Sequence, residues 1–242
     1  MKLLPRGRSV SIKITHNLLL SLLSNEDRAA LGEFENVVLP IRTRLDGIED
    51  GDRYAYFMES GIASVVADIE GKLAVELGII GHEGTTALSA IYGDTESPFQ
   101  IFMQVEGSAV RCETAALRRA IDERPAVRAL MQRFARAFSI QIATTALANG
   151  RFKLDERLAR WLLMVSDRVG PSFHITHEFI AIMLGVRRSG VTLAVQILEG
   201  KRFIRASRGL ITVADREGLI AAANGSYGFC ETQYRRLLVK DA

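Results

Sequence analysis

The segment from Ile175 to Glu199 constrains the fold more than any other part of the chain, because it reads as two short helices joined by a tight turn. Thr176 is a good helix N-cap, and Gly185 can adopt the left-handed conformation that often ends a helix. Apolar residues then recur at i, i+3, i+4 and i+7 from Val191 to Leu198, as on the buried face of a second helix. This pattern is typical of a helix-turn-helix, in which the start of the second helix enters the DNA major groove.

The sequence after the second helix predicts a short β-hairpin. Phe203-Ile204 and the run from Leu210 to Val213 are β-prone, and a turn at 207–209 separates them. Arg205 and Arg208 lie on this hairpin. The alternative interpretation is an ordinary helical hairpin with a solvated Arg187-Arg188 pair. A basic hairpin directly after the second helix instead favours a winged helix-turn-helix.

Three segments resemble the Crp/Fnr family of bacterial transcription regulators, in particular an alphaproteobacterial-type subgroup. They are RWLLMVSDRVG (Arg160 to Gly170), HEFIAIMLGVRRSGVTLA (His177 to Ala194) and RGLITVADREGL (Arg208 to Leu219). The resemblance covers nearly the whole chain and implies an α+β fold. In that fold an N-terminal cyclic-nucleotide-binding-like β-roll precedes a long dimerisation helix and a C-terminal winged helix-turn-helix. It also implies a sequence-specific DNA-binding transcription regulator that acts as a homodimer on a palindromic operator and contacts RNA polymerase.

The charge distribution agrees with a nucleic-acid partner. The 242-residue chain has a net charge of only +3, but residues 151–213 contain 11 Lys and Arg against 5 Asp and Glu. Local positive charge is the electrostatic footprint of a polyanion such as double-stranded DNA, although alone it would equally fit an anionic membrane surface. The sequence contains no run of 18 apolar residues and no signal peptide, so we expect a cytoplasmic protein without a membrane partner.

The resemblance also assigns DNA-contacting residues. Arg188 and Ser189 match the base-reading positions of the family, and Leu193 matches a third. Arginine is suited to guanine O6 and N7. Many family members carry glutamate at the position of Ser189 and a charged residue at that of Leu193, so a different operator is expected. Contacts to DNA phosphates are predicted for Thr176, His177, Arg187, Arg205 and Arg208.

The N-terminal half is predicted to be β-rich. From Glu35 to Thr114 the chain has short runs of Val, Ile, Phe and Tyr, with glycines at roughly ten-residue intervals, as in a β-sandwich or roll. The segment from Tyr54 to Asp68 is the clearest strand, turn, strand unit. The predicted domains are a sensor β-roll with N-terminal helices (16–114), a connecting and dimerisation helix (115–149), the winged helix-turn-helix (150–222) and a tail without assigned structure (223–242).

A long helix is predicted from Ala126 to about Asn149, with a hinge at Asn149-Gly150. About 24 residues at 1.5 Å each span roughly 36 Å, which is enough to link a sensor to a DNA-binding domain. A stripe close to heptad spacing predicts contact with a second copy of the chain. The alternative is a lone helix lying across the β-roll. The stripe consists of Leu130, Phe134, Ala137, Phe138, Gln141, Ile142, Thr145 and Ala148.

The sensor half contains only part of a cyclic-nucleotide site. Gly81, Glu83 and Gly84 resemble the glycine-rich, carboxylate-bearing segment of the family and form the candidate effector pocket. The arginine that would pair with the cyclic phosphate is missing, because Ser97-Pro98-Phe99 stands in its place. A buried phosphate without a cation would be costly. We therefore do not expect cyclic AMP, and the small-molecule effector stays unknown.

No cofactor, metal site or catalytic motif is predicted. Cys112 and Cys230 form no CxxC pair, an iron-sulfur cluster would need four thiolates, and His174 and His177 are a weak metal pair. No nucleophile elbow or phosphate-binding loop occurs, so enzyme activity is not expected. The alternative function is a ligand-binding regulatory module whose helix-turn-helix mediates protein contacts. That alternative predicts no DNA affinity that falls steeply with salt.

Overall fold

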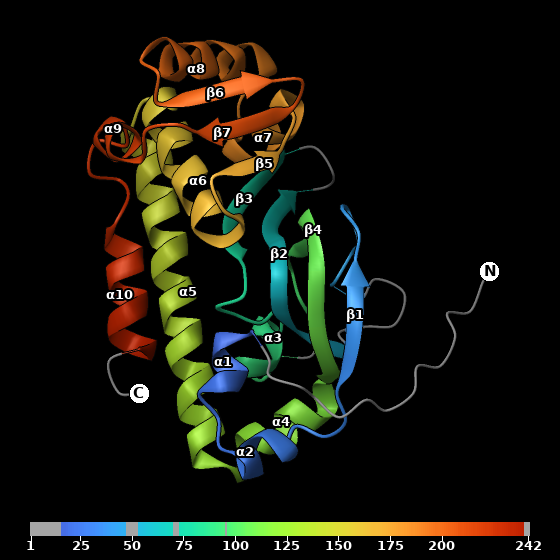
Figure 1. The fold of residues 1–242 in the computed structure, drawn as a ribbon. Helices are drawn as coiled ribbons and strands as arrows, with labels where there is room; N and C mark the ends of the chain where they lie inside the picture. Colours follow the sequence, from blue (N-terminus) through green and yellow to red (C-terminus); the bar gives the residue numbers. More distant parts are fainter. Residues whose placement is uncertain (1–15, 47–52, 70–72, 95, 240–242) are drawn as a thin grey trace, which may run out of the picture.

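The computed structural model describes residues 16–46, 53–69, 73–94 and 96–239 of the chain. Figure 1 shows an N-terminal sheet on one side, a long helix α5 beside it, and a C-terminal unit of helices and short strands at one end. The structure confirms the predicted α+β fold, with a sheet-containing N-terminal half, a long helix and a C-terminal winged helix-turn-helix.

The elements follow one another in a simple order. The N-terminal half contains α1 (Leu18–Ser21), α2 (Asn25–Ala29), β1 (Glu35–Leu39), β2 (Tyr54–Ile69), β3 (Leu73–Ile80), α3 (Leu88–Ile91), β4 (Gln100–Glu113) and α4 (Thr114–Glu123). The long helix is α5 (Pro125–Arg151). The C-terminal half contains α6 (Leu154–Val169), β5 (Ser172–His174), α7 (His177–Leu184), α8 (Arg188–Gly200), β6 (Ile204–Ser207), β7 (Leu210–Val213), α9 (Arg216–Ala222) and α10 (Phe229–Leu238).

The N-terminal sheet is antiparallel with strand order β1-β4-β2-β3, and its central strands are long. The prediction of a turn within Tyr54–Asp68 is wrong, because β2 runs through Gly61 without reversing. Gly61 has a φ of +75° and lies at a register shift opposite Gly107 of β4. A Cβ on Gly107 would lie 2.2 Å from the carbonyl oxygen of Ser60. These two glycines therefore mark a bulge where two backbones approach closely, rather than a turn.

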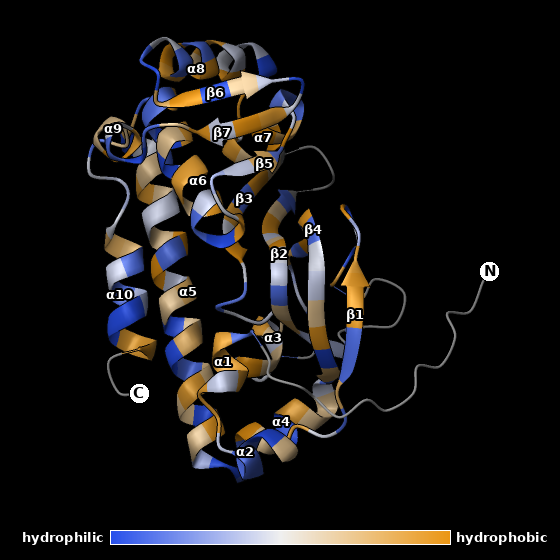
Figure 2. Cartoon of the chain, viewed as in Figure 1, coloured by the Kyte–Doolittle hydropathy of each residue, from blue (hydrophilic) through white to orange (hydrophobic). Residues whose placement is uncertain are grey.

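Most of the predicted heptad stripe on α5 is buried within its own chain, whereas Ile142 and Thr145 are half-buried. Leu130, Phe134 and Phe138 belong to the same hydrophobic cluster as Phe57 of β2 and Leu117 of α4. Hydropathy coloring in Figure 2 shows apolar and hydrophilic residues recurring along α5. The interpretation of this stripe as partner-facing is therefore wrong. Periodicity shows which side of a helix is buried but does not identify what covers it.

The C-terminal end of α5 and the tail both differ from the prediction. The helix continues through Asn149 and Gly150 to Arg151, so the predicted hinge lies inside it. The tail, for which no structure was predicted, forms α10 and packs along α5. Leu238 of α10 is buried in the N-terminal hydrophobic cluster. The end of the described chain thus contributes to the core of its N-terminal half.

The C-terminal unit packs directly on the sheet. A second hydrophobic cluster joins Ile62 and Ile79 of the sheet to Leu162 of α6 and Met183 of α7. Among the described helices, none alone combines the length and the apolar composition needed to cross a membrane. Only α7 and α8 taken together meet that test, as a pair bent by 106°.

The contrast between Gly107 and Gly150 gives a first prediction. Gly107→Ala should lower the free energy of unfolding by about 1 to 3 kcal/mol, because its Cβ would collide with the backbone of β2. Gly150→Ala should instead raise it by about 0.5 to 1 kcal/mol, because Gly150 is helical with open space around it. Denaturant unfolding of both variants measures the difference. A destabilising Gly150→Ala would contradict a continuous helix at this point.

Candidate nucleic-acid interface

Helices α7 and α8 form the predicted helix-turn-helix. Thr176 caps α7, and its side-chain oxygen accepts a hydrogen bond from the Phe179 backbone N–H at 3.2 Å. Gly185 ends α7 in the left-handed conformation with a φ of 62°. The predicted apolar series from Val191 to Leu198 is buried. The bend of 106° between the helices lies in the range expected for this motif.

The outer face of α8 presents the predicted base-reading residues to solvent. Arg188 and Ser189 are exposed in its first turn, and the Leu193 side chain is 59% exposed although it is apolar. Arg187 is exposed at the N-cap position. The N-terminus of a helix also carries unpaired N–H groups and a partial positive charge. The start of α8 is therefore suited to an anionic, groove-bearing partner.

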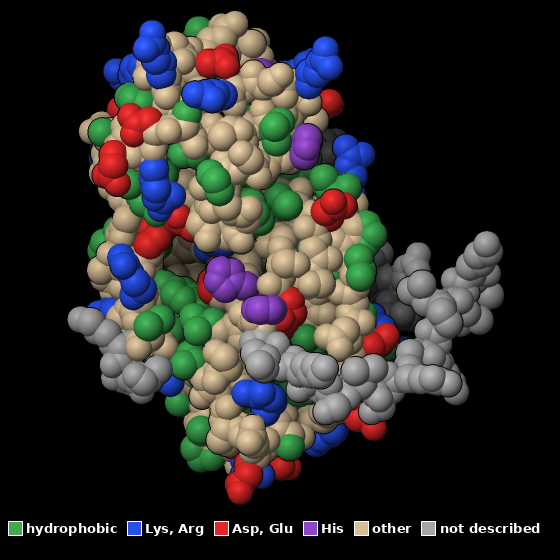
Figure 3. All heavy atoms as spheres, viewed as in Figure 1, with side chains coloured by type: hydrophobic (Ala, Val, Ile, Leu, Met, Phe, Trp, Pro, Cys, Tyr) green, Lys and Arg blue, Asp and Glu red, His purple; other side chains and the backbone are tan. Residues whose placement is uncertain are grey.

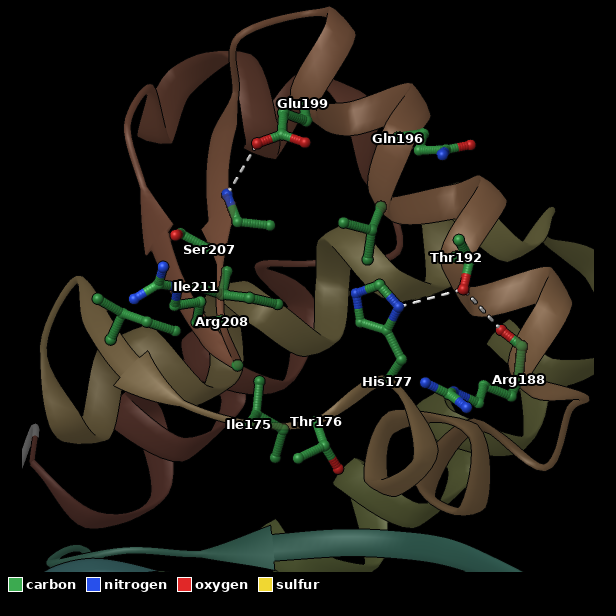
Figure 4. A pocket seen from close by; sticks show the side chains of 14 residues that line it. Ile175, Thr176, His177, Arg188, Thr192, Gln196, Glu199, Ser207, Arg208 and Ile211 are labelled. Carbon is green, nitrogen blue, oxygen red and sulfur yellow. Dashed lines mark hydrogen bonds between the residues drawn. The ribbon is translucent and has the colours of Figure 1, made fainter.

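A groove of about 470 Å³ lies between α8 and the hairpin of β6 and β7. Figure 4 shows Arg188, Thr192 and Gln196 along successive turns of α8 on this groove. Sequence reasoning did not include Thr192 or Gln196 among the site residues. Thr192 lies four residues and Gln196 eight residues after Arg188, and this spacing along an amphipathic helix was the available signal.

Hydrogen bonds connect the start of α7 to the start of α8. The Nδ1 atom of His177 lies 3.1 Å from the Thr192 hydroxyl, which donates to the carbonyl oxygen of Arg188 at 3.2 Å. The structure thus places His177, a predicted phosphate contact, against the predicted recognition helix. Thr176 is exposed beside it.

The hairpin of β6 and β7 has the geometry of a wing. It turns through Arg208 and Gly209, which have φ values of 48° and 79°, as in a two-residue hairpin turn of the I′ type. The backbone N–H of Ile175 donates to the Gly209 carbonyl at 2.7 Å, and that of Ala206 donates to Glu199 of α8 at 2.9 Å. These contacts hold the wing against α8 and against the segment that leads into α7.

The predicted phosphate contacts lie on one end of the molecule. Arg187, Arg205 and Arg208 are exposed around α8 and the wing, and Figure 3 shows Lys and Arg side chains at this end. The conformation of Arg208 is notable, because side chains other than Gly, Asn and Asp rarely occupy the left-handed region. Arg42 and Arg202 are also exposed with φ values of 68° and 63°, so the place of Arg208 on the wing, rather than its backbone conformation, makes it a candidate phosphate contact.

The candidate effector residues occupy a different environment. Glu83 pairs with Arg168 of α6, with its Oε1 2.6 Å from Nη2 and 2.8 Å from Nε. A Cβ on Gly81 would lie 2.8 Å from Cγ of Arg168, and one on Gly84 would lie 2.6 Å from the Phe134 ring. The three residues are thus close together, but side chains of α5 and α6 lie directly against them.

Neither a metal centre nor a reactive thiol is evident within the described ranges. No group of three or more His, Cys, Asp or Glu side chains there could hold a metal ion. Cys112 and Cys230 are both buried and free. Burial raises the pKa of Cys112 to about 12, so its thiol is protonated near neutral pH.

Comparisons with known proteins agree with this geometry. A family model described as a Crp-like helix-turn-helix domain matches residues 156–222. A search of curated proteins found no match. Among solved structures, FixK2 from Bradyrhizobium japonicum superposes with a TM-score of 0.67 at 14% identity, covering 78% of this chain and 96% of that one.

Two further structures show the same similarity. A candidate crp/fnr-family regulator from Eubacterium rectale has a TM-score of 0.68 at 16% identity and covers 87% of this chain and 99% of its own. TTHB099, a CRP-family regulator from Thermus thermophilus, has a TM-score of 0.64 at 17% identity, covering 80% and 98%. The narrower alphaproteobacterial subgroup stays a prediction. Residues 156–222 thus form a Crp-like helix-turn-helix domain, and the chain has the fold of Crp/Fnr transcription regulators.

Proposed function

We propose that this protein is a sequence-specific DNA-binding transcription regulator that acts as a cytoplasmic homodimer and has no enzymatic activity. The observation that carries the proposal is the exposed first turn of α8, beside a wing with two further exposed arginines. Arg188, Ser189 and Leu193 read base edges. Thr176, His177, Arg187, Arg205 and Arg208 contact phosphates, which fix the register without specifying sequence.

Gln196 is a further base-reading residue in this proposal. It lies two turns beyond Arg188 on the same groove and is exposed. A side-chain amide can contact adenine N6 and N7 in a bidentate manner, whereas arginine pairs with guanine. Each half-site should therefore combine a guanine under Arg188 with an adenine under Gln196.

A different face of α5 supports the homodimer. Arg136, Ile140, Ala143 and Leu147 follow one another at spacings of four, three and four residues, as in a coiled-coil seam. Leu147 is 57% exposed, and Ala143 is also exposed. A second copy of the chain packing on this face would bury these side chains and present two α8 helices to paired half-sites.

Cyclic AMP is not the ligand of the N-terminal half in this proposal. The residues from 73 to 110 contain no Lys or Arg, and the carboxylate of Glu83 is already paired with Arg168. A cyclic phosphate would have no cation from this segment to compensate its desolvation. RNA polymerase remains the expected protein partner.

Selection of bound sequences from a random duplex pool tests the function. The protein should enrich a palindrome, and Arg188→Ala should weaken binding by about 1 to 3 kcal/mol and relax one position per half-site. Gln196→Ala should relax a different position. Arg119→Ala removes the same charge from an exposed site on α4 and should leave the selected sequence unchanged. Binding that is independent of salt and without enrichment would favour a module that contacts proteins instead of DNA.

Substitution of Arg208 should change the stability of the protein and its DNA affinity in opposite directions. Because Asn tolerates the left-handed region, Arg208→Asn should raise the free energy of unfolding by about 1 kcal/mol. It should also lower DNA affinity and reduce the slope of log affinity against log salt by the amount expected for the loss of about one phosphate contact. Arg202→Asn is the matched control, because Arg202 has a φ of 63° and is exposed. An equal loss of slope in both variants would assign the effect to net charge alone.

The proposed dimer face is tested by Leu147→Glu. A carboxylate at this position should be excluded from an apolar interface, so the variant should sediment as a monomer and lose cooperative binding to a palindrome. Phe229→Glu is the control, because Phe229 is 59% exposed on α10 and lies outside the seam. Analytical ultracentrifugation distinguishes the two species. A dimer that survives Leu147→Glu would place the interface elsewhere.

A further inference from the structure

Glu76 is a buried carboxylate at the junction between the sheet and the C-terminal unit. It lies on β3 with only 5% of its surface exposed. Its Oε2 accepts hydrogen bonds from the Ser64 hydroxyl of β2 at 2.6 Å and from the Gln104 amide of β4 at 3.3 Å. Its Oε1 accepts one from the Trp161 indole N–H of α6 at 2.8 Å. The carboxylate therefore connects three strands of the sheet to the first helix of the C-terminal half.

The surroundings of Glu76 have opposing effects on its charge. Burial raises its pKa from 4.5 to about 7, against the opposing effects of the hydrogen bonds from Ser64 and Trp161. The positive charges of Arg160 and Arg168, both on α6, also favour the ionised form. From α7 the Met183 sulfur approaches the Ser64 hydroxyl at 3.4 Å. Both protonation states are therefore accessible near neutral pH.

The neighbouring amide of Gln104 can serve either state. In the structure its Nε2 donates to Glu76, while its Oε1 is buried and has no hydrogen-bond partner among the described residues. Rotation of this amide by 180° would place Oε1 as the acceptor for a proton on Glu76. The network thus has a donor for the carboxylate and an acceptor for the carboxylic acid.

The cover over Glu76 belongs to the DNA-binding unit. Ser64, Glu76 and Gln104 belong to the sheet, whereas Trp161 and Met183 belong to α6 and α7. Separation of α6 from the sheet would expose the carboxylate to water. We propose that Glu76 is a proton-binding effector site, and that its protonation strengthens the docking of the DNA-binding unit on the sheet.

The direction follows from proton linkage. A carboxyl whose pKa is higher in the docked than in the separated state takes up a proton on docking, so docking is favoured at low pH. This contribution is full below the pKa of the separated state and is lost as pH rises through 7. If the water-exposed carboxyl has the ordinary pKa of 4.5, the equilibrium constant for docking should fall roughly ten-fold between pH 6 and pH 8. The regulatory role of this docking equilibrium rests on the proposed function, whereas docking itself can be measured without DNA.

The single tryptophan provides a local probe. Trp161 is the only Trp of the chain and is buried against Glu76, so its fluorescence should change as Glu76 titrates. The wild-type protein should show a transition with a midpoint near pH 7 that is absent in Glu76→Gln. Glu106→Gln makes the same charge change at an exposed position of β4 and should retain the transition. A transition that persists in Glu76→Gln would overturn the assignment.

Ser64→Ala is a second variant that preserves the carboxylate and the probe. Because the Ser64 hydroxyl favours the ionised form, its removal should move the midpoint to higher pH. If the fluorescence transition did not come from the titration of Glu76, Ser64→Ala would leave its midpoint unchanged. That result would also overturn the proposal. This variant keeps the test valid if Glu76→Gln does not fold.

Energy transfer measures docking directly. Dyes attached after Glu33→Cys and Glu217→Cys would report the separation of the sheet from α9, because both native cysteines are buried. Excess unlabelled protein ensures that each labelled chain reports on itself. Transfer should differ between pH 6 and pH 8, and the difference should disappear when Glu76→Gln is added. Equal transfer at both pH values in the otherwise native protein would refute the docking switch, whether or not the protein binds DNA.

Discussion

The contact of α6 with the sheet determines the arrangement of the rest of the C-terminal unit. It combines apolar packing with two polar contacts, one from Trp161 to Glu76 on β3 and one from Arg168 to Glu83 in the loop after β3. Apolar burial is not directional, whereas these polar groups require specific partners once they are out of water. The apolar cluster thus supplies most of the attraction. The polar contacts define the position of the helix along the sheet.

The same junction contains an unusual buried cation. Arg160 is 4% exposed, and its Nη2 lies 3.3 Å from the Thr145 hydroxyl and 3.9 Å from the Cys230 sulfur, on α5 and α10 respectively. Its Nε has no partner among the described residues. The negative charge of Glu76 partly compensates this guanidinium. The buried guanidinium of Arg160 on α6 therefore interacts with groups on α5, on α10 and on the sheet.

The helix-turn-helix could be predicted from the sequence because its signals are local. The Thr176 cap, the left-handed Gly185 and the buried series after Val191 each depend on a few neighbouring residues. The wing was equally predictable from its β-prone runs and its glycine. Candidate contact residues followed from their places on these elements, and Thr192 and Gln196 could be placed on the outer side of the second helix, although the groove that they line beside the wing became evident only in the structure.

The features that sequence reasoning missed depend on distant partners. Gly61 and Gly107 have the spacing of turn residues, but their function requires the opposite strand. The stripe on α5 was visible, whereas the sheet that covers it lies far away in sequence. In the sequence, Glu83 resembled a ligand-binding carboxylate. Its partner Arg168 is 85 residues away, so the local pattern could not show that this carboxylate is already paired. Long-range pairing of this kind leaves no trace in local patterns.

The position of α7 explains how a change at the sheet can reach DNA. On one side its Phe179 ring packs edge-on against Phe102 of β4, with centroids 6.1 Å apart. On the other side α7 shares a core with α8 and the wing, so these elements are packed together. Packed cores change arrangement in discrete steps rather than by continuous deformation. A shift of the α6 and α7 contact with the sheet would therefore reorient α8 as a rigid body, and in a dimer it would change the distance between the two recognition helices.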